Sequence, residues 1–251
     1  MTNGSKIAIV VPLKGMTAQS FEPRRKFLLD LAAPGTDIGV YFVPDSPRDI
    51  ESRFDKALVA PLVSRACISA ERDGYQGVML WGGVDPAVPV ARETVQIPVV
   101  GPFEASLAYA NLLAASFSVL MPVGYRYFIN DDTIREHGLE ARCRSLRGIE
   151  MEPEETGDHP DVSMERLYEQ GTLARDVDGA HALVWGCLTL WDRIHELGPR
   201  LGIPVINPAM AAMFMLDSLI RMGQTFSHRT YPRISEADRE LAFDFYRTRG
   251  E

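Results

Sequence analysis

Residues 73–83 read DGYQGVMLWGG and residues 178–187 read DGAHALVWGC, so one pattern occurs twice in this chain. Each copy has an Asp-Gly pair followed by a short apolar run that ends in Trp-Gly, which predicts a turn and then a buried strand. Further along, Ile97 and Ile203 each begin an Ile-Pro-Val strand signal that leads, after a short break, into an Ala-rich helical segment. The repetition predicts two similar lobes built from parallel strands and covering helices.

Apolar runs of strand length alternate with longer amphipathic runs along the rest of the chain. This alternation predicts an α/β fold of two similar lobes, each a parallel sheet flanked by helices, with a pseudo-twofold relation and the active site in the cleft between them. We expect an N-terminal lobe of residues 1–101 plus 209–251 and a second lobe of residues 102–208, and we expect the acidic stretch 152–160 to be a solvated connection. Strands are expected at 6–11, 38–43, 77–81, 99–100, 117–121, 143–149, 182–185 and 205–206, and helices at 24–31, 57–72, 88–95, 104–114, 131–137, 164–176, 190–197, 210–222 and 235–247.

Composition limits the partners and the compartment of this protein. The chain has 251 residues, of which 46% are hydrophobic, enough for one large core or two linked smaller ones. Its net charge of −8 argues against nucleic acid or an anionic membrane as the main partner. The apolar run at 7–11 is too short for a signal peptide or a membrane span, so we expect a cytoplasmic protein.

Cysteines and histidines show no metal or disulfide pattern. Cys67, Cys143 and Cys187 lie far apart without a Cys-x-x-Cys pair, which predicts reduced thiols. Cys67 falls in a predicted helix and Cys143 in a predicted strand, so both are expected to be structural. The five histidines lack metal-ligand spacing and no phosphate-binding loop is found, so no metal or other cofactor is expected. His228, in a polar stretch after the last core helix, is the histidine that we keep as a site candidate.

Cys187 is the strongest candidate for a catalytic group. It follows a strand at the carboxyl end of a predicted parallel sheet, where small-molecule sites form. Thr189 and Asp192 are expected to begin a helix whose free N–H groups would favour the thiolate. Gly186 and Leu188 belong to the same turn, in which the backbone can approach a ligand closely. An arbitrary cysteine at a strand end is more often structural, but its place in the repeated turn favours a functional role.

The other copy of the turn supplies further candidates. Counted from the Asp-Gly pairs, Gly82 stands where the second copy has its cysteine. With Gly83 it either exposes N–H groups to a carboxylate or enolate oxygen or forms a plain tight turn. Pro12 and Lys14 end the first strand at the same sheet edge, where the lysine either pairs with a carboxylate or is an ordinary surface residue. Glu104 begins a helix after a strand, where it either caps that helix or reaches the site.

Four segments together carry a family resemblance: GGVDP at 82–86, PVVGPFEA at 98–105, GLEARCRSLR at 138–147 and GCLTL at 186–190. In this order they resemble the Cys-x-x-Asp-Pro turn, the two intervening motifs and the second cysteine turn of the aspartate/glutamate/hydantoin racemase superfamily. The hydantoin racemase branch is the most similar, and the resemblance covers roughly residues 6–232. It implies a homo-oligomer that acts on a small carboxylate or a cyclic amide.

Three departures from the family pattern bear on the mechanism. Gly82 replaces the first family cysteine, the first strand ends in Val11-Pro12 rather than in an Asn-Pro-Asn-like sequence, and the second cysteine turn ends in Leu-Thr-Leu. A glycine, a single cysteine and a Val-Pro start look like arylmalonate decarboxylase, a superfamily member that protonates an enediolate from one face. That resemblance implies that Tyr125 or Tyr127 matches the site tyrosine of that enzyme.

These residues predict a cofactor-independent enzyme that acts at the carbon α to a carbonyl or carboxylate. Cys187 would donate a proton or act as a nucleophile in a decarboxylation, or in another lyase or isomerase reaction, while the turns at Gly82 and Gly186 hold the anionic intermediate. A hydantoin or amino-acid racemase is the alternative, and such a reaction needs proton transfer on two opposite faces. A small-molecule binder that has lost turnover is a further alternative.

Overall fold

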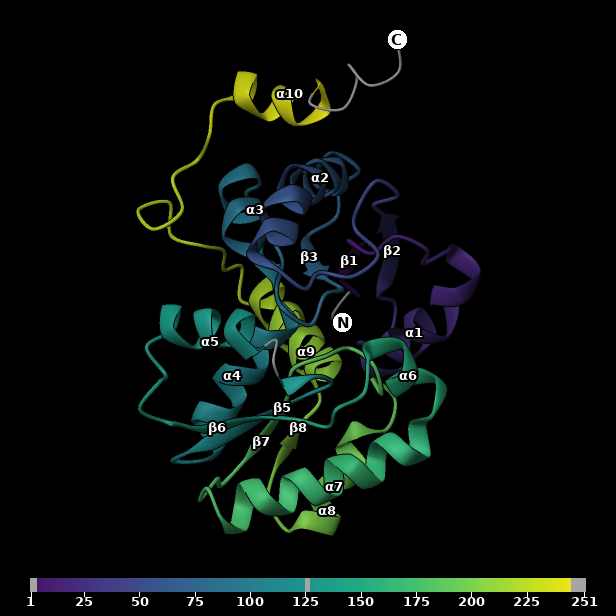
Figure 1. Ribbon diagram of the computed structural model, residues 1–251. Coiled ribbons are helices and arrows are strands. Elements are labelled where there is room, and N and C mark those ends of the chain that lie inside the picture. Colours follow the sequence, from purple (N-terminus) through teal and green to yellow (C-terminus); the bar gives the residue numbers. More distant parts are fainter. Residues whose placement is uncertain (1–3, 125–126, 245–251) are drawn as a thin grey trace. The chain divides into compact units, whose positions relative to one another are not determined.

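The computed structural model describes residues 4–124 and 127–244. In these residues the strands form two four-stranded sheets with the orders β2-β1-β3-β4 and β6-β5-β7-β8, in which all the strand pairings are parallel. Helices flank the strands of each sheet (Figure 1). The predicted α/β architecture is therefore confirmed, whereas the expected cleft and pseudo-twofold stay predictions.

The chain divides into two compact units, residues 1–101 with 213–251, and residues 102–212. The sequence placed the second boundary between residues 208 and 209, just before the last core helix. The structure divides the chain four residues later, because this helix contributes to both units.

That helix, α9 (Pro208–Arg221), packs its C-terminal part against the sheet of the first unit. A Cβ atom added at Gly77, the first residue of β3, would lie 2.7 Å from Leu216 Cδ1 and 2.9 Å from Ile220 Cδ1. Glycine is needed at this position because the helix side chains approach the strand backbone closely.

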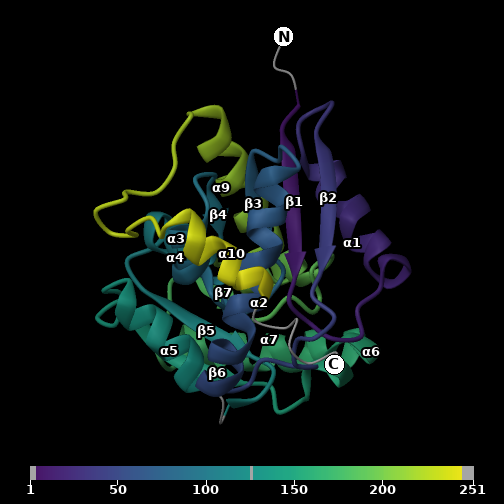
Figure 2. The same ribbon diagram turned by 90° about the horizontal axis from the view of Figure 1, so that it is seen from above.

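In the first unit, β1 (Lys6–Val11) lies between β2 (Asp37–Phe42) and β3 (Gly77–Leu80), and β4 (Val99–Val100) pairs with β3. Residues 7–11 are fully buried, as expected for a central strand that is covered on both faces. Figure 2 shows β1 and β2 side by side, and α10 lies against α2. The further helices of this unit are α1 (Ala18–Leu31), α2 (Arg53–Arg72), α3 (Val88–Thr94) and α10 (Glu236–Asp244).

The second unit repeats this strand order. Its central strand β5 (Phe117–Met121) pairs with β6 (Cys143–Gly148) and β7 (Leu183–Trp185), and β8 (Val205–Ile206) pairs with β7. Among the helices of the described residues, none combines the length and hydropathy needed to cross a bilayer. The helices of this unit are α4 (Pro102–Leu113), α5 (Tyr127–Glu136), α6 (Pro153–Asp158), α7 (Pro160–Asp176), the 3₁₀ helix η2 (Ile194–Glu196) and α8 (Leu197–Leu201).

The two tryptophans of the repeated pattern each enter the core of their own unit. Trp81 is 1% exposed and packs edge-on against Phe21, with 5.0 Å between the ring centroids. Trp185 is also 1% exposed, and its indole N–H donates to the Thr189 carbonyl oxygen at 2.8 Å. A large buried ring at the strand end therefore anchors each turn to its core.

The stretch 152–160 is mostly exposed, as predicted, but it is largely helical, so the expected loop conformation is wrong. The helix α6 forms here, and the Glu152 N–H donates to the Glu155 carboxylate at 3.1 Å in a capping interaction. Thr156 is fully buried, and its hydroxyl donates to the Glu152 carbonyl oxygen at 3.0 Å. A single buried threonine leaves no apolar periodicity, and the acidic composition therefore indicated a loop.

Candidate active site

The turn after β7 places the Cys187 thiol next to two hydrogen-bond donors. The Gly186 N–H donates to the Leu120 carbonyl oxygen at 2.8 Å, which ties the start of the turn to β5. The Cys187 Sγ accepts from the Thr189 N–H at 3.5 Å and from the Thr189 hydroxyl at 3.4 Å. Donors that face a sulfur stabilise the thiolate more than the thiol. The side chain is half-buried, so this thiol is neither sealed in the core nor fully exposed.

The helix expected to begin at Thr189 is not formed, and that prediction is wrong. Residues 187–193 make bends and turns, and the next helical element, η2, begins at Ile194. Leu190 has a φ of +56°, a left-handed conformation that a right-handed helix cannot contain. The Trp185 indole holds this shape by its hydrogen bond to the Thr189 carbonyl oxygen. The donors to the thiol therefore come from Thr189 itself and not from a helix N-terminus.

The other two thiols lie in surroundings that oppose ionisation. Cys67 is fully buried in α2, and burial raises its pKa well above the ordinary value. Burial also raises the pKa of Cys143 to about 11, and the charge of Asp131 adds to this shift. The Cys143 thiol donates to the Ser145 carbonyl oxygen at 3.7 Å. Burial opposes ionisation of Cys67 and Cys143, whereas two hydrogen-bond donors face the Cys187 sulfur, so Cys187 is the best candidate for the reactive thiol.

The matching turn after β3 has no room for a side chain at Gly82. The Asp85 N–H donates to the Gly82 carbonyl oxygen at 3.1 Å and closes the turn. A Cβ atom added at Gly82 would lie 2.8 Å from Pro86 Cδ and 3.6 Å from Pro12 Cγ. Two of the predicted residues, Gly82 and Pro12, therefore adjoin, and a side chain at residue 82 would need the Pro86 ring to shift.

Lys14 and Glu104 lie in different surroundings and in different units. Lys14 is exposed, and its backbone N–H donates to the Pro47 carbonyl oxygen at 3.0 Å. Glu104 is 8% exposed in the first turn of α4, and its Oε2 lies 3.8 Å from His137 Nε2. Glu104 lies in the same unit as Cys187, and its helix α4 packs against β7, the strand that leads to this cysteine.

The remaining candidates are placed as follows. Gly83 is half-buried in the turn next to Gly82, and His228 is exposed in a turn after α9. Leu188 is 7% exposed within the Cys187 turn. Tyr125 lies outside the described residues, so its predicted role stays a prediction.

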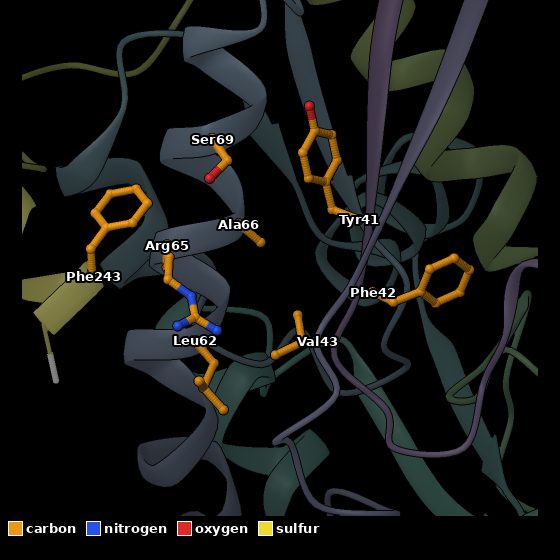
Figure 3. Close-up of a pocket in the computed structure, with 8 residues that line it drawn as sticks. All are labelled: Tyr41, Phe42, Val43, Leu62, Arg65, Ala66, Ser69 and Phe243. Carbon is orange, nitrogen blue, oxygen red and sulfur yellow. The ribbon is translucent and has the colours of Figure 1, made fainter. Parts of the chain in front are cut away.

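A pocket of about 310 Å³ lies in the first unit (Figure 3). Its walls come from the end of β2, from α2 and from the side chain of Phe243 on α10. No residue predicted for the site lines this pocket. The lining residues are Tyr41, Phe42, Val43, Leu62, Arg65, Ala66, Ser69 and Phe243.

One polar residue that the sequence did not indicate lies beside the Cys187 turn. Asn130, in the first turn of α5, is 4% exposed, and its Nδ2 atom has no hydrogen-bond partner among residues 4–124 and 127–244. A Cβ atom added at Gly186 would lie 3.2 Å from this nitrogen. In the sequence, Asn130 is one of several polar residues near a helix start, and only its burial distinguishes it.

Comparison with known proteins places the chain in a family. The profile of the family described as Asp/Glu/Hydantoin racemase matches residues 26–216. The hydantoin racemase of Rhizobium meliloti is 28% identical over 225 residues, which are 88% of this chain and 92% of that protein. The structure of allantoin racemase from Klebsiella pneumoniae superposes with a TM-score of 0.84 at 26% identity, covering 92% of this chain and 94% of that one. Arylmalonate decarboxylase, with a TM-score of 0.62 at 17% identity over 86% of this chain and 92% of its own, shares the fold. This chain belongs to the Asp/Glu/hydantoin racemase family.

Proposed function

We propose that this protein racemises a hydantoin-like cyclic ureide at the ring carbon next to a carbonyl group, with Cys187 as one of the proton-transferring groups. Family membership supports the proposal, as does the similarity over most of the chain to proteins named hydantoin racemase and allantoin racemase. The observation that carries it at the site is the Cys187 sulfur, which accepts two hydrogen bonds from Thr189. These relatives favour racemisation over the decarboxylation that the sequence alone suggested.

In the proposed reaction the Cys187 thiolate removes the proton from the α-carbon. The electron pair of the broken C–H bond moves toward the carbonyl oxygen, and the sulfur becomes a thiol. The Thr189 N–H and hydroxyl stabilise the negative charge on sulfur before this step, and again after the thiol has returned a proton to the substrate. Racemisation then requires a second acid on the opposite face of the anion. Gly82 has no side chain to supply it, so Glu104 and Lys14 are the first residues to test.

A second candidate function is decarboxylation of a substituted malonate. The observation that favours it is Gly82, which stands in the place of the first family cysteine and leaves the turn after β3 without a second thiol. Loss of CO₂ leaves an enediolate, and one thiol can protonate that anion without a second proton-transferring group. The likeness to arylmalonate decarboxylase concerns the fold alone.

A substrate screen in D₂O separates the two functions. Single enantiomers of 5-substituted hydantoins and of amino acids, and prochiral malonates, are incubated with the protein and followed by proton NMR and chiral chromatography. A racemase converts a hydantoin of either hand to the racemate while deuterium enters the α-position. A decarboxylase releases CO₂ from a malonate and gives one deuterated enantiomer. Binding of these compounds without turnover would contradict both functions and support a binding protein.

We expect Cys187→Ala to lower turnover at least about a hundredfold, because general acid–base catalysis typically contributes this much. Cys143→Ala is the matched control, since this thiol also lies at a strand end but has a pKa raised by burial, and turnover should remain near that of the wild type. Initial rates of α-proton exchange measure both variants. A folded Cys187→Ala protein with wild-type rates would exclude the proposed mechanism.

A further inference from the structure

We infer that the side-chain amide of Asn130 binds substrate: it donates a hydrogen bond to a carbonyl or carboxylate oxygen of the molecule on which Cys187 acts. The inference rests on the proposed function, because it assigns a further group to the same turn. It goes beyond the family pattern, since it is drawn from one unpaired donor and its surroundings.

The first observation is that the side-chain amide nitrogen of Asn130 is buried and donates to no acceptor within the described residues. Asn130 is 4% exposed, and its Nδ2 is closed to solvent without a hydrogen-bond partner in the part of the chain that the structure describes. An amide N–H that has lost water and found no acceptor costs the free energy of its desolvation. A protein retains such a group at little net cost when a ligand oxygen completes the bond.

The second observation is the place of this donor. Asn130 lies in the helix that follows β5, and an added Cβ at Gly186 would meet its Nδ2 at 3.2 Å. The same added atom would lie 3.3 Å from Met121 Cγ and 3.3 Å from Val119 Cγ1. The amide thus abuts the backbone of the residue that precedes Cys187, at the carboxyl end of the sheet where ligands bind in such folds.

A second asparagine of the same unit shows what a structural amide looks like here. Asn207 is also 4% exposed, but its Nδ2 donates to the Trp191 carbonyl oxygen at 2.6 Å. Its Oδ1 accepts from the N–H groups of Ala209 and Met210 at 3.0 and 3.3 Å, so it caps α9. The nitrogen and the oxygen of the Asn207 amide therefore both stabilise the fold. The Asn130 Nδ2, in contrast, donates to no acceptor within the described residues.

The chemistry of the donor sets the class of ligand. A neutral amide N–H donates to an oxygen acceptor, and this hydrogen bond strengthens as negative charge develops on the oxygen. A ring carbonyl that turns enolate-like during proton removal is such an acceptor, and so is a carboxylate. Loss of one preorganised donor to a developing oxyanion typically lowers kcat by about a hundredfold to a thousandfold.

The test compares Asn130→Leu with Asn207→Leu, because leucine has the same branching but no hydrogen-bonding atoms. For Asn130→Leu we expect an unchanged or raised Tm and a loss of about a hundredfold in kcat/KM for the active hydantoin. For Asn207→Leu we expect a lowered Tm, since three hydrogen bonds are lost. Wild-type kcat/KM in Asn130→Leu, or a fall in its Tm like that of Asn207→Leu, would overturn the inference.

A readout that needs no turnover separates this inference from the proposed function. The side-chain ¹⁵N–¹H signal of Asn130 is assigned by its absence in Asn130→Leu and followed while 5-methylhydantoin or phenylmalonate is added to the Cys187→Ala protein. We expect the signal to shift and its protons to exchange more slowly. A protein without turnover in the screen refutes the proposed function, and an Asn130 signal that stays unchanged refutes this inference on its own.

Discussion

Cys67, Cys143 and Cys187 differ in what surrounds each sulfur, and alkylation should reveal the difference. Because the thiolate is the reactive form, iodoacetamide near neutral pH should label Cys187 first. Cys67 is fully buried, and Cys143 has a pKa raised to about 11, so both should react slowly until the protein unfolds. Labelling of Cys143 should speed up as the pH rises toward that value. Timed peptide mass spectrometry measures the order, and labelling of Cys143 ahead of Cys187 at neutral pH would contradict it.

The Pro86 ring limits the space for a side chain at Gly82. An added Cβ would lie 2.8 Å from the Pro86 ring, so Gly82→Ala should lower the free energy of unfolding by about 1–3 kcal/mol. Pro86→Ala in the same protein should recover part of this loss. Gly157→Ala is the matched control, because no atom lies within 4 Å of its added Cβ. Urea denaturation measures all three, and a fully stable Gly82→Ala would show that the ring moves freely. A cysteine at residue 82 would contact the same proline ring, so Gly82→Cys is best combined with Pro86→Ala.

Among the helices, α10 is attached to α2 by a largely buried ion pair. The Arg239 Nη2 lies 2.5 Å from Glu71 Oε2, with 7% and 17% of the two side chains exposed. Glu71→Ala should lower the free energy of unfolding by about 3–5 kcal/mol, because the buried guanidinium keeps only its pair with the exposed Glu236 and the Gln96 N–H loses its acceptor. Arg72→Ala removes exposed ion pairs to Glu236 and Glu240 between the same helices and should change stability little. Equal effects of the two variants in thermal denaturation would contradict this assignment.

Helix ends could be predicted from the sequence better than helix starts. The helices expected at 57–72 and 164–176 end where α2 and α7 end, but both begin four residues earlier in the structure. Apolar periodicity marks only the part of a helix that contacts the core, whereas the first turn is polar and depends on its cap. In α2 that cap is Ser52, whose side chain accepts from the Asp55 N–H at 3.0 Å. Strands were easier to place, because β1 and β5 are continuous buried runs.

For the molecule as a whole, the repeated pattern was the most informative feature of the sequence. It predicted two parallel sheets, and both have the same strand order, with β1 and β5 at equivalent central places. The candidate site could be predicted only in part. The sequence indicated the position of Cys187, but the shape of its turn depends on the Trp185 and Asn207 side chains, which bond carbonyl oxygens of that turn. Whether a buried polar group such as Asn130 finds a partner depends on packing, which no local pattern encodes.

The hydrogen bond between the Trp185 indole and the Thr189 carbonyl oxygen gives the protein a built-in optical reporter. The same threonine donates to the Cys187 sulfur, so a reagent or ligand that displaces Thr189 also changes the polarity around the indole. Indole emission shifts in wavelength and intensity with such changes. Trp81 packs against Phe21 in the core of the other unit and adds a background emission, and Trp191 adds a contribution from the turn itself. Chemistry at the thiol can therefore be followed by intrinsic fluorescence, without a dye or a coupled enzyme.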